Sequence, residues 1–161
     1  DNYLNRFMLP KLDKIELNLS IKTNNFIESN FIDGALALNL ITGQLAKVSI
    51  SSKSSQRHKL QKGTIVGCHV TLRKKDSLSF FDSFFHVVCP RLKNFTRLSL
   101  KNVDKKQNLT ICVNDLIAFP SLEEHYDSFA HLKNLTITFV FDSRRQAEVQ
   151  YFCRRLRVPL I

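Results

Sequence analysis

The feature that most constrains the fold is an alternating stretch, "GTIVGCHVTLR", at residues 63–73. A β-strand sends successive side chains to opposite faces. From Val66 onward the even-numbered positions are apolar, whereas the odd-numbered positions carry the polar side chains of His69, Thr71 and Arg73. The stretch therefore predicts a strand with one buried face and one polar face.

The same alternation predicts four more strands, at residues 11–20, 46–50, 108–113 and 132–141. The apolar side chains expected on their inner faces are Ile15, Leu17, Leu19, Val48, Ile50, Leu135, Ile137 and Phe139. Half-polar strands suit an antiparallel sheet that helices cover on one side only. A chain of 161 residues suits one domain. We therefore predict a single α+β domain over residues 1–161, an antiparallel sheet with helices packed on one face and the other face open.

Three helices are expected between these strands and after the last of them. The first spans residues 27–42 and ends at Gly43, a residue type typical of helix ends. Asp76 or Ser77 could cap the second helix. Its apolar stripe would comprise Leu78, Phe81, Phe85 and Val88. Ser143 and Gln146 fit a capping box for the terminal helix.

Several classes of protein are disfavoured by the sequence. The four cysteines, Cys68, Cys89, Cys112 and Cys153, lie among apolar residues without a CxxC pair, which predicts buried thiols in a reducing compartment. No apolar run approaches the roughly 20 residues of a membrane-spanning helix, so no membrane partner is expected. Motifs such as HExxH, GxSxG or a Walker loop are absent from the sequence. We therefore expect no catalytic residue, no metal site and no cofactor.

The charge of the chain favours a polyanionic partner. The formal net charge is +10 and the pI is about 9.7. No Asp or Glu occurs between Asp33 and Asp76, a stretch with eight cationic residues: Lys47, Lys53, Arg57, Lys59, Lys62, Arg73, Lys74 and Lys75. A block of one sign needs counter-charge from elsewhere, which a nucleic acid supplies. An idle basic surface is the alternative.

The predicted first and third strands would place Lys14, Asn18, His69, Thr71 and Arg73 on one polar face. Lysine and arginine hold phosphates, and Asn and Thr can satisfy sugar hydroxyls or base edges. This combination suits a folded RNA surface that is read largely by its shape and its 2′-hydroxyls. Taken alone, Thr71 could be an ordinary strand residue, and Asn18 could bond to its own backbone.

Seven segments together resemble the family of large-subunit ribosomal protein five, the 5S ribosomal RNA-binding protein. They are "LPKLDKIELN" (9–18), "ITGQ" (41–44), "GTIVGCHVTLR" (63–73), "FF" (80–81), "PRLKNF" (90–95), "FP" (119–120) and "LTIT" (135–138). The similarity runs in order over residues 9–159. It implies a structural ribosomal protein without catalysis, placed in the central protuberance of the large subunit.

The resemblance also implies RNA contacts. The open sheet face would bind 5S ribosomal RNA, large-subunit ribosomal RNA, or both, and the family's RNA-contacting Asn, Gln and Thr would fall on Asn18, Gln44 and Thr71. With the neighbouring polar residues, the expected set that binds ribosomal RNA is Lys11, Lys14, Asn18, Gln44, Lys47, His69, Thr71 and Arg73.

Two loops acquire expected partners in the same way. The loop at residues 51–62 would reach the elbow of P-site transfer RNA through Lys53, Ser54, Arg57, His58, Lys59 and Lys62. The loop at residues 101–108 would face the small-subunit head protein numbered thirteen. An intersubunit bridge would form there through Lys101, Lys105 and Lys106.

Departures from the family pattern favour an organellar copy. Leu45 and Ala46 replace the usual Lys-Pro after Gln44, "SIKTNN" replaces glycines after the first strand, and only four glycines occur. We expect a mitochondrial ribosome, with a plastid or bacterial one as the alternative. Two rival functions stay open: a small basic RNA-processing or RNA-modifying enzyme with His58 or His69 as base, and a free-standing RNA-binding regulator.

Overall fold

The fold was analysed in a computed structural model of the chain. The structure describes residues 5, 9–20, 29–56, 60–92, 103–104, 106–143 and 146–156. For residues 29, 30 and 146 it describes the backbone alone.

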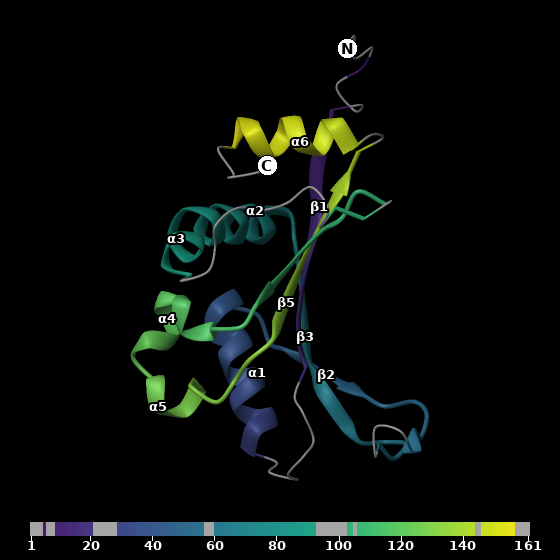
Figure 1. The fold of residues 1–161 in the computed structure, drawn as a ribbon, viewed down its shortest axis with the longest axis vertical. Helices are drawn as coiled ribbons and strands as arrows, with labels where there is room; N and C mark the ends of the chain where they lie inside the picture. The colour runs from purple at the N-terminus through teal and green to yellow at the C-terminus, as the bar shows by residue number, and fades with distance from the viewer. Residues whose placement is uncertain are drawn as a thin grey trace. The chain divides into compact units, whose positions relative to one another are not determined.

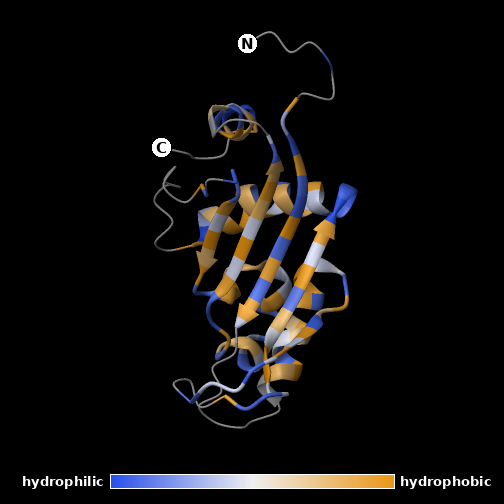
Figure 2. Ribbon diagram, turned by 90° about the vertical axis from the view of Figure 1, so that its right-hand side faces the viewer, coloured by the Kyte–Doolittle hydropathy of each residue, from blue (hydrophilic) through white to orange (hydrophobic). Residues whose placement is uncertain are grey.

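Five strands form one open antiparallel sheet in the order β2-β3-β1-β5-β4 (Figure 1). The strands are β1 (Lys11–Ser20), β2 (Lys47–Ile50), β3 (Ile65–Arg73), β4 (Leu109–Val113) and β5 (Leu135–Asp142). Each strand overlaps a predicted one closely, because hydrophobic alternation is a strong signal for half-buried strands. Figure 2 shows this alternation of hydrophilic and hydrophobic residues along the strands.

The helical elements follow the strands in sequence. They are α1 (Ser29–Thr42), α2 (Lys74–Ser83), the π-helix η3 (Phe84–Val88), α3 (Cys89–Arg91), the 3₁₀-helix η5 (Leu116–Ala118), α4 (Pro120–Glu123), α5 (Tyr126–Phe129) and α6 (Gln146–Arg155). Within the described part of the chain, none of the helices has the length and apolar character needed to cross a bilayer.

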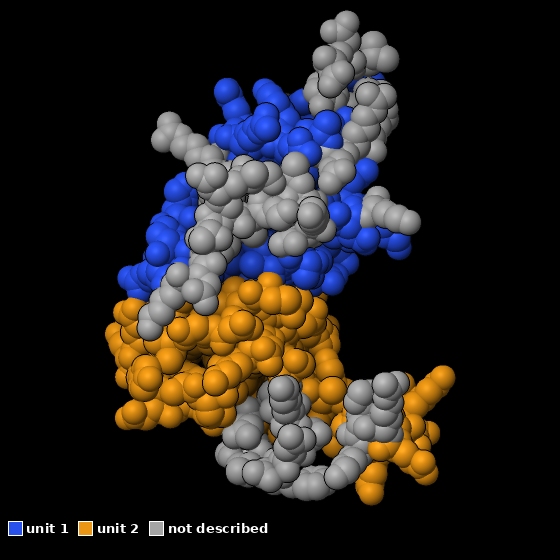
Figure 3. Space-filling model, in the orientation of Figure 1, with its two compact units in different colours: residues 1–16, 72–111, 137–161 blue, residues 17–71, 112–136 orange. Residues whose placement is uncertain are grey.

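The chain falls into two compact units (Figure 3). Unit 1 comprises residues 1–16, 72–111 and 137–161, and unit 2 comprises residues 17–71 and 112–136. Strands β1, β3, β4 and β5 each contribute residues to both units. The predicted α+β class is therefore confirmed, and each unit has its own helices beside its share of the strands.

Aromatic rings fill the core of unit 1. The ring centroid of Phe81 on α2 lies 5.5 Å from that of Phe139 on β5, and the ring of Phe85 lies 5.3 Å from Phe139. Phe84, which begins the π-helix, is fully buried. The predicted burial of Phe81, Phe85 and Val88 is confirmed. Helices α2 and η3 thus cover the apolar side of the unit 1 strand residues.

The predicted stripe on α2 was wrong at Leu78, whose side chain is 55% exposed. Ser77 takes the buried position instead, because its hydroxyl donates a 2.7 Å hydrogen bond to the Lys74 carbonyl and so keeps a partner on burial. The buried face is therefore turned by one residue relative to the prediction, and it includes Phe80.

The predicted N-cap of α2 was also wrong. The helix begins at Lys74, directly after β3, and neither Asp76 nor Ser77 precedes it. Lys74 has a φ of +56°, an uncommon backbone conformation for a residue other than glycine, which turns the chain from strand into helix without a linker. The capping box predicted for α6 cannot be followed at Gln146, whose side chain lies outside the described residues; the Ser143 hydroxyl donates to Gln107 Oε1 at 2.9 Å.

Helix α1 covers the apolar side of β3 in unit 2. The Cys68 thiol lies 3.8 Å from the carbonyl oxygen of Phe31, and Ala37 and Leu38 are fully buried. Gly43 ends the helix as predicted, with a φ of +69° and its N–H bonded to the Asn39 carbonyl. The predicted start at residue 27 lies outside the described residues.

The inner-face prediction for β2 was wrong, because Val48 and Ile50 are 46% and 63% exposed. These residues pair with Cys68 and Ile65 of β3. Since β2 is the outermost strand of the sheet, its apolar side chains lie at the edge of the helical cover rather than beneath it.

Three of the four cysteines are buried, as predicted, and Cys112 is exposed, which corrects the fourth prediction. Ile111 and Val113 face the interior, so strand alternation turns Cys112 to the opposite face. All four thiols are free. Burial raises the pKa of the Cys89 and Cys153 thiols to about 12.

Candidate nucleic-acid interface

Five polar side chains of unit 2 lie opposite the buried side chains of their strands. We call this set the unit-2 polar face: Asn18 of β1, Lys47 and Ser49 of β2, and His69 and Thr71 of β3. Because β2, β3 and β1 are neighbours in the sheet, the structure brings the predicted residues Asn18, His69 and Thr71 together and adds Lys47 beside them.

The register of β2 and β3 fixes the centre of this face. Lys47 lies opposite His69, and Ser49 lies opposite Gly67. The Ser49 hydroxyl is 2.9 Å from Nδ1 of His69. Ser49 was not among the predicted site residues, although its place two residues after Lys47 in the same strand put it on the same face.

Gly67 allows β3 to approach β1 closely. A Cβ atom at this position would collide with the carbonyl oxygen of Leu19 and lie 3.3 Å from the Cα atom of Ser20. Any larger residue would therefore push β1 and β3 apart at this point. The spacing of Asn18 and His69 on the polar face depends on this contact between backbones.

Gln44 is half-buried in the turn between α1 and β2. The Thr42 hydroxyl donates to the Leu38 carbonyl at 2.6 Å and lies 3.3 Å from the backbone nitrogen of Gln44, which donates to it. These bonds fix the turn after α1. The predicted RNA-binding glutamine therefore precedes β2 and is not itself a strand residue.

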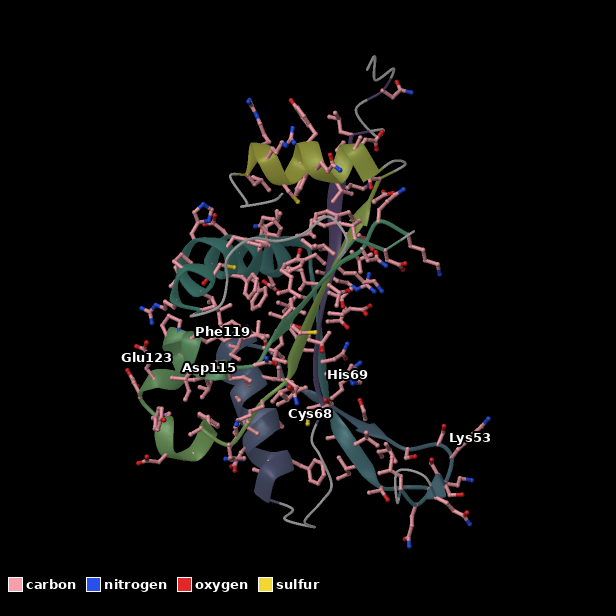
Figure 4. The ribbon with its side chains drawn as sticks, in the orientation of Figure 1. Lys53, Cys68, His69, Asp115, Phe119 and Glu123 are labelled. Carbon is pink, nitrogen blue, oxygen red and sulfur yellow. The ribbon has the colours of Figure 1, made fainter. Side chains whose placement is uncertain are left out.

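The electrostatics of unit 2 are strongly one-sided along its strands. None of the strand residues in unit 2 is Asp or Glu. Lys47, Lys53 and Lys62 are exposed, and no carboxylate of the described residues pairs with them. Figure 4 shows Lys53 in the segment after β2 and His69 on β3. This surface can accept negative charge from a partner.

Backbone hydrogen bonds extend the β2–β3 hairpin into the predicted loop. Ser51 N–H donates to the Thr64 carbonyl at 2.9 Å, and Ser55 and Leu60 exchange two bonds of 2.9 and 3.0 Å. Ser54 is exposed. The predicted tip residues Arg57, His58 and Lys59 lie outside the described residues. The described part of the loop is therefore hydrogen-bonded although its side chains are mostly polar.

Unit 1 holds three of the predicted RNA-binding cations in a different setting. Lys11 Nζ lies 3.4 Å from Asp142 Oδ2, and Lys14 Nζ lies 2.6 Å from Glu16 Oε1. Arg73 is exposed at the end of β3. Two of these cations are thus already next to a carboxylate of their own unit.

The predicted bridge loop is described in part, around Lys106. Asp104 N–H donates to the Asn108 carbonyl at 2.9 Å, and Gln107 N–H donates to the Asp104 carbonyl at 2.8 Å. Lys106 is exposed in this turn, whereas Lys101 and Lys105 lie outside the described residues. No group of three or more His, Cys, Asp or Glu residues in the described ranges could hold a metal ion.

Comparison with known proteins gives a consistent set of relatives. The model of the C-terminus of the ribosomal uL5 family matches residues 65–160. The large ribosomal subunit protein uL5m of Reclinomonas americana is 31% identical over 159 residues, covering 99% of this chain and 87% of that protein. The uL5 proteins of Mycoplasma pneumoniae and Desulfosudis oleivorans are 31% and 34% identical. Their alignments cover 95% and 98% of this chain, and 84% and 87% of those proteins.

Proposed function

Because the chain belongs to the ribosomal uL5 family, we propose that its unit-2 polar face binds ribosomal RNA. As a member of that family it is a structural constituent of the large ribosomal subunit and not an enzyme. One observation carries the proposal: the face offers cations and hydrogen-bonding side chains on strands without a carboxylate. Such a surface suits the phosphate backbone of RNA.

The residues of the face divide into two chemical roles. Lys47 supplies positive charge for a phosphate. Asn18 and Thr71 supply hydrogen bonds to sugar hydroxyls or base edges, which position the RNA on the strands. The ligand of the proposal is 5S ribosomal RNA, large-subunit ribosomal RNA, or both, and Gln44 extends the contact beyond β2.

Unit 1 contributes less to the proposed RNA contact than unit 2. Arg73 is free to meet a phosphate, since it is exposed and has no partner among the described residues. Lys11 and Lys14 lie beside Asp142 and Glu16, so a phosphate must compete with a carboxylate for each of them. We therefore rank these two lysines below Lys47 in the RNA interface.

The loop at residues 51–62 is the proposed contact with P-site transfer RNA. The exposed Lys53 and Lys62 support it, because both can pair with phosphates. Retention of P-site transfer RNA by ribosomes that carry Arg57→Gln and Lys59→Gln tests this role. Unchanged retention at raised salt would contradict it.

The turn that carries Lys106 is the proposed bridge to the small-subunit head protein numbered thirteen. The exposure of Lys106 supports this proposal. Subunit association measured with Lys106→Gln tests it, and full association at limiting magnesium would contradict it. A mitochondrial ribosome is the proposed location. Sedimentation of the protein with the large subunit of isolated mitochondria at high salt tests both the location and the assembled state, and would exclude a free-standing regulator.

The proposed RNA face is tested by Asn18→Ala combined with Thr71→Ala. Both side chains lie on the polar face, so their removal leaves no cavity, and the missing hydrogen bonds should weaken RNA binding by roughly 1–3 kcal/mol. Affinity for 5S and large-subunit ribosomal RNA transcripts is measured by gel shift at fixed salt. Asn114→Ala, which removes an exposed asparagine outside the strands of unit 2, is the matched control. Unchanged affinity of the double variant would show that RNA binds elsewhere.

A further inference from the structure

The contact between Ser49 and His69 affects how the polar face can meet RNA. Its geometry follows from the register, because Ser49 lies opposite Gly67, which has no side chain, and next to the pair formed by Lys47 and His69. The Ser49 hydroxyl therefore reaches diagonally to Nδ1 of His69, at 2.9 Å. Both side chains are half-buried, which limits the alternative positions of the imidazole ring.

The bond leaves one ring nitrogen of His69 for a ligand. A serine hydroxyl can donate or accept, and a histidine ring presents Nδ1 and Nε2 as separate groups. When the ring is neutral, the hydroxyl can donate to Nδ1 and the proton resides on Nε2. When the ring is charged, Nδ1–H donates to the hydroxyl and Nε2 again carries a proton. In both states the ring offers an N–H donor at Nε2.

We propose that Ser49 is a positioning residue that holds the His69 ring so that its Nε2–H donates to a phosphate oxygen of the bound RNA. This inference rests on the proposed RNA-binding role of the unit-2 polar face. A phosphate oxygen is the acceptor because Lys47 lies opposite His69 and supplies positive charge at the same place. Ser49 itself does not touch the RNA, and its effect on binding passes through His69.

The experiment is a double-mutant cycle on RNA affinity. The variants are Ser49→Ala, His69→Ala and the combination of both, measured by gel shift with the ribosomal RNA transcript that the parent protein binds. Ser49→Ala should weaken binding about 2- to 10-fold, the value of one hydrogen bond, and His69→Ala should weaken it more. The double variant should bind as His69→Ala does, because Ser49 has no effect once the ring is gone.

Two further variants separate positioning from folding. Ser49→Thr keeps the hydroxyl and suits a strand, so it should restore affinity to within about twofold of the parent. Ser52→Ala removes an exposed serine just after β2 and should leave affinity unchanged. Nitrogen-15 NMR of the free protein should show a proton on Nε2 of His69 in the parent, and a different tautomer balance in Ser49→Ala.

The outcomes distinguish this inference from the proposed function. If Ser49→Ala and His69→Ala bind normally while Lys47→Gln binds weakly, the positioning role is wrong and the RNA face stands. If all three bind normally, the RNA face itself is wrong. If the double variant shows the product of the two single losses, Ser49 contacts RNA directly and the positioning role is wrong. Identical ring spectra in the parent and Ser49→Ala would overturn it as well.

Discussion

The two units differ in what lies beside their cations. In unit 1, Lys11 and Lys14 are next to Asp142 and Glu16, at 3.4 and 2.6 Å. In unit 2, Lys47 lies on strands without Asp or Glu and has no ion-pair partner among the described residues. The overall charge of +10 therefore overstates the RNA-binding capacity of one unit and describes the other well. Local pairing, rather than net charge, decides where a polyanion can bind.

The cores of the two units differ as well. Unit 1 is held by stacked and edge-on phenylalanine rings from α2, η3, β5 and α6. Unit 2 is held by aliphatic side chains of α1 against β3, with a glycine at the approach of β1 and β3. We expect the two units to respond differently to substitutions in the core and on the polar face.

The largest expected effect is that of Phe81→Ala in unit 1. The ring of Phe81 lies 4.6, 5.5 and 6.3 Å from the rings of Phe85, Phe139 and Phe152, and its side chain is 4% exposed. Truncating a buried phenylalanine typically lowers the free energy of unfolding by about 3–5 kcal/mol. Urea unfolding measures the decrease. Leu78→Ala on the same helix is the control, because this exposed side chain should change stability by less than about 0.5 kcal/mol.

A smaller destabilisation is expected from Gly67→Ala in unit 2. The added methyl group would collide with the Leu19 carbonyl, and overpacking of this kind costs about 1–3 kcal/mol. Urea unfolding measures this cost. RNA affinity should fall too, because the displaced strand carries Asn18. Thr71→Ala on the same strand keeps the backbone contact and should cost less than about 0.5 kcal/mol. Parental stability in Gly67→Ala would mean that β1 and β3 are farther apart than described.

The smallest perturbation is chemical labelling of the cysteines in the native protein. Cys112 is exposed on the polar side of β4, whereas Cys68, Cys89 and Cys153 are buried. Burial raises the pKa of all three buried thiols, so they hold less reactive thiolate at neutral pH. We expect one fast-reacting thiol, assigned to Cys112 by its absence in Cys112→Ser. Fast labelling of a second cysteine would show that one of the two cores opens readily.

Much of the fold could be predicted from the sequence, because each strand has a period of two that burial enforces. The alternation correctly predicted the buried faces of β1, β3 and β5. It could not show that β2 is the edge strand, so Val48 and Ile50 were placed inside. Nor could it show that Ser77 satisfies its hydroxyl within the helix and displaces Leu78 from the buried face.

The candidate site was predictable in its residue types but not in its charge balance. Glu16 follows Lys14 by two positions, so the alternation alone places both on one face, and this signal could have revealed their pairing. Asp142 is distant in the sequence from Lys11 and meets it only because β5 lies next to β1. Ser49 was missed because its role depends on the register between β2 and β3.

The most direct test of this contrast is the salt dependence of RNA binding in two matched double variants. Lys47→Gln with Lys62→Gln removes unpaired cations of unit 2, and Lys11→Gln with Lys14→Gln removes paired cations of unit 1. The slope of log affinity against log salt falls by roughly 0.7–0.9 for each phosphate that is no longer neutralised by the protein. We predict that decrease at both positions of the unit 2 variant and a clearly smaller change in the unit 1 variant. Equal changes in the two slopes, or a larger one in unit 1, would contradict the account.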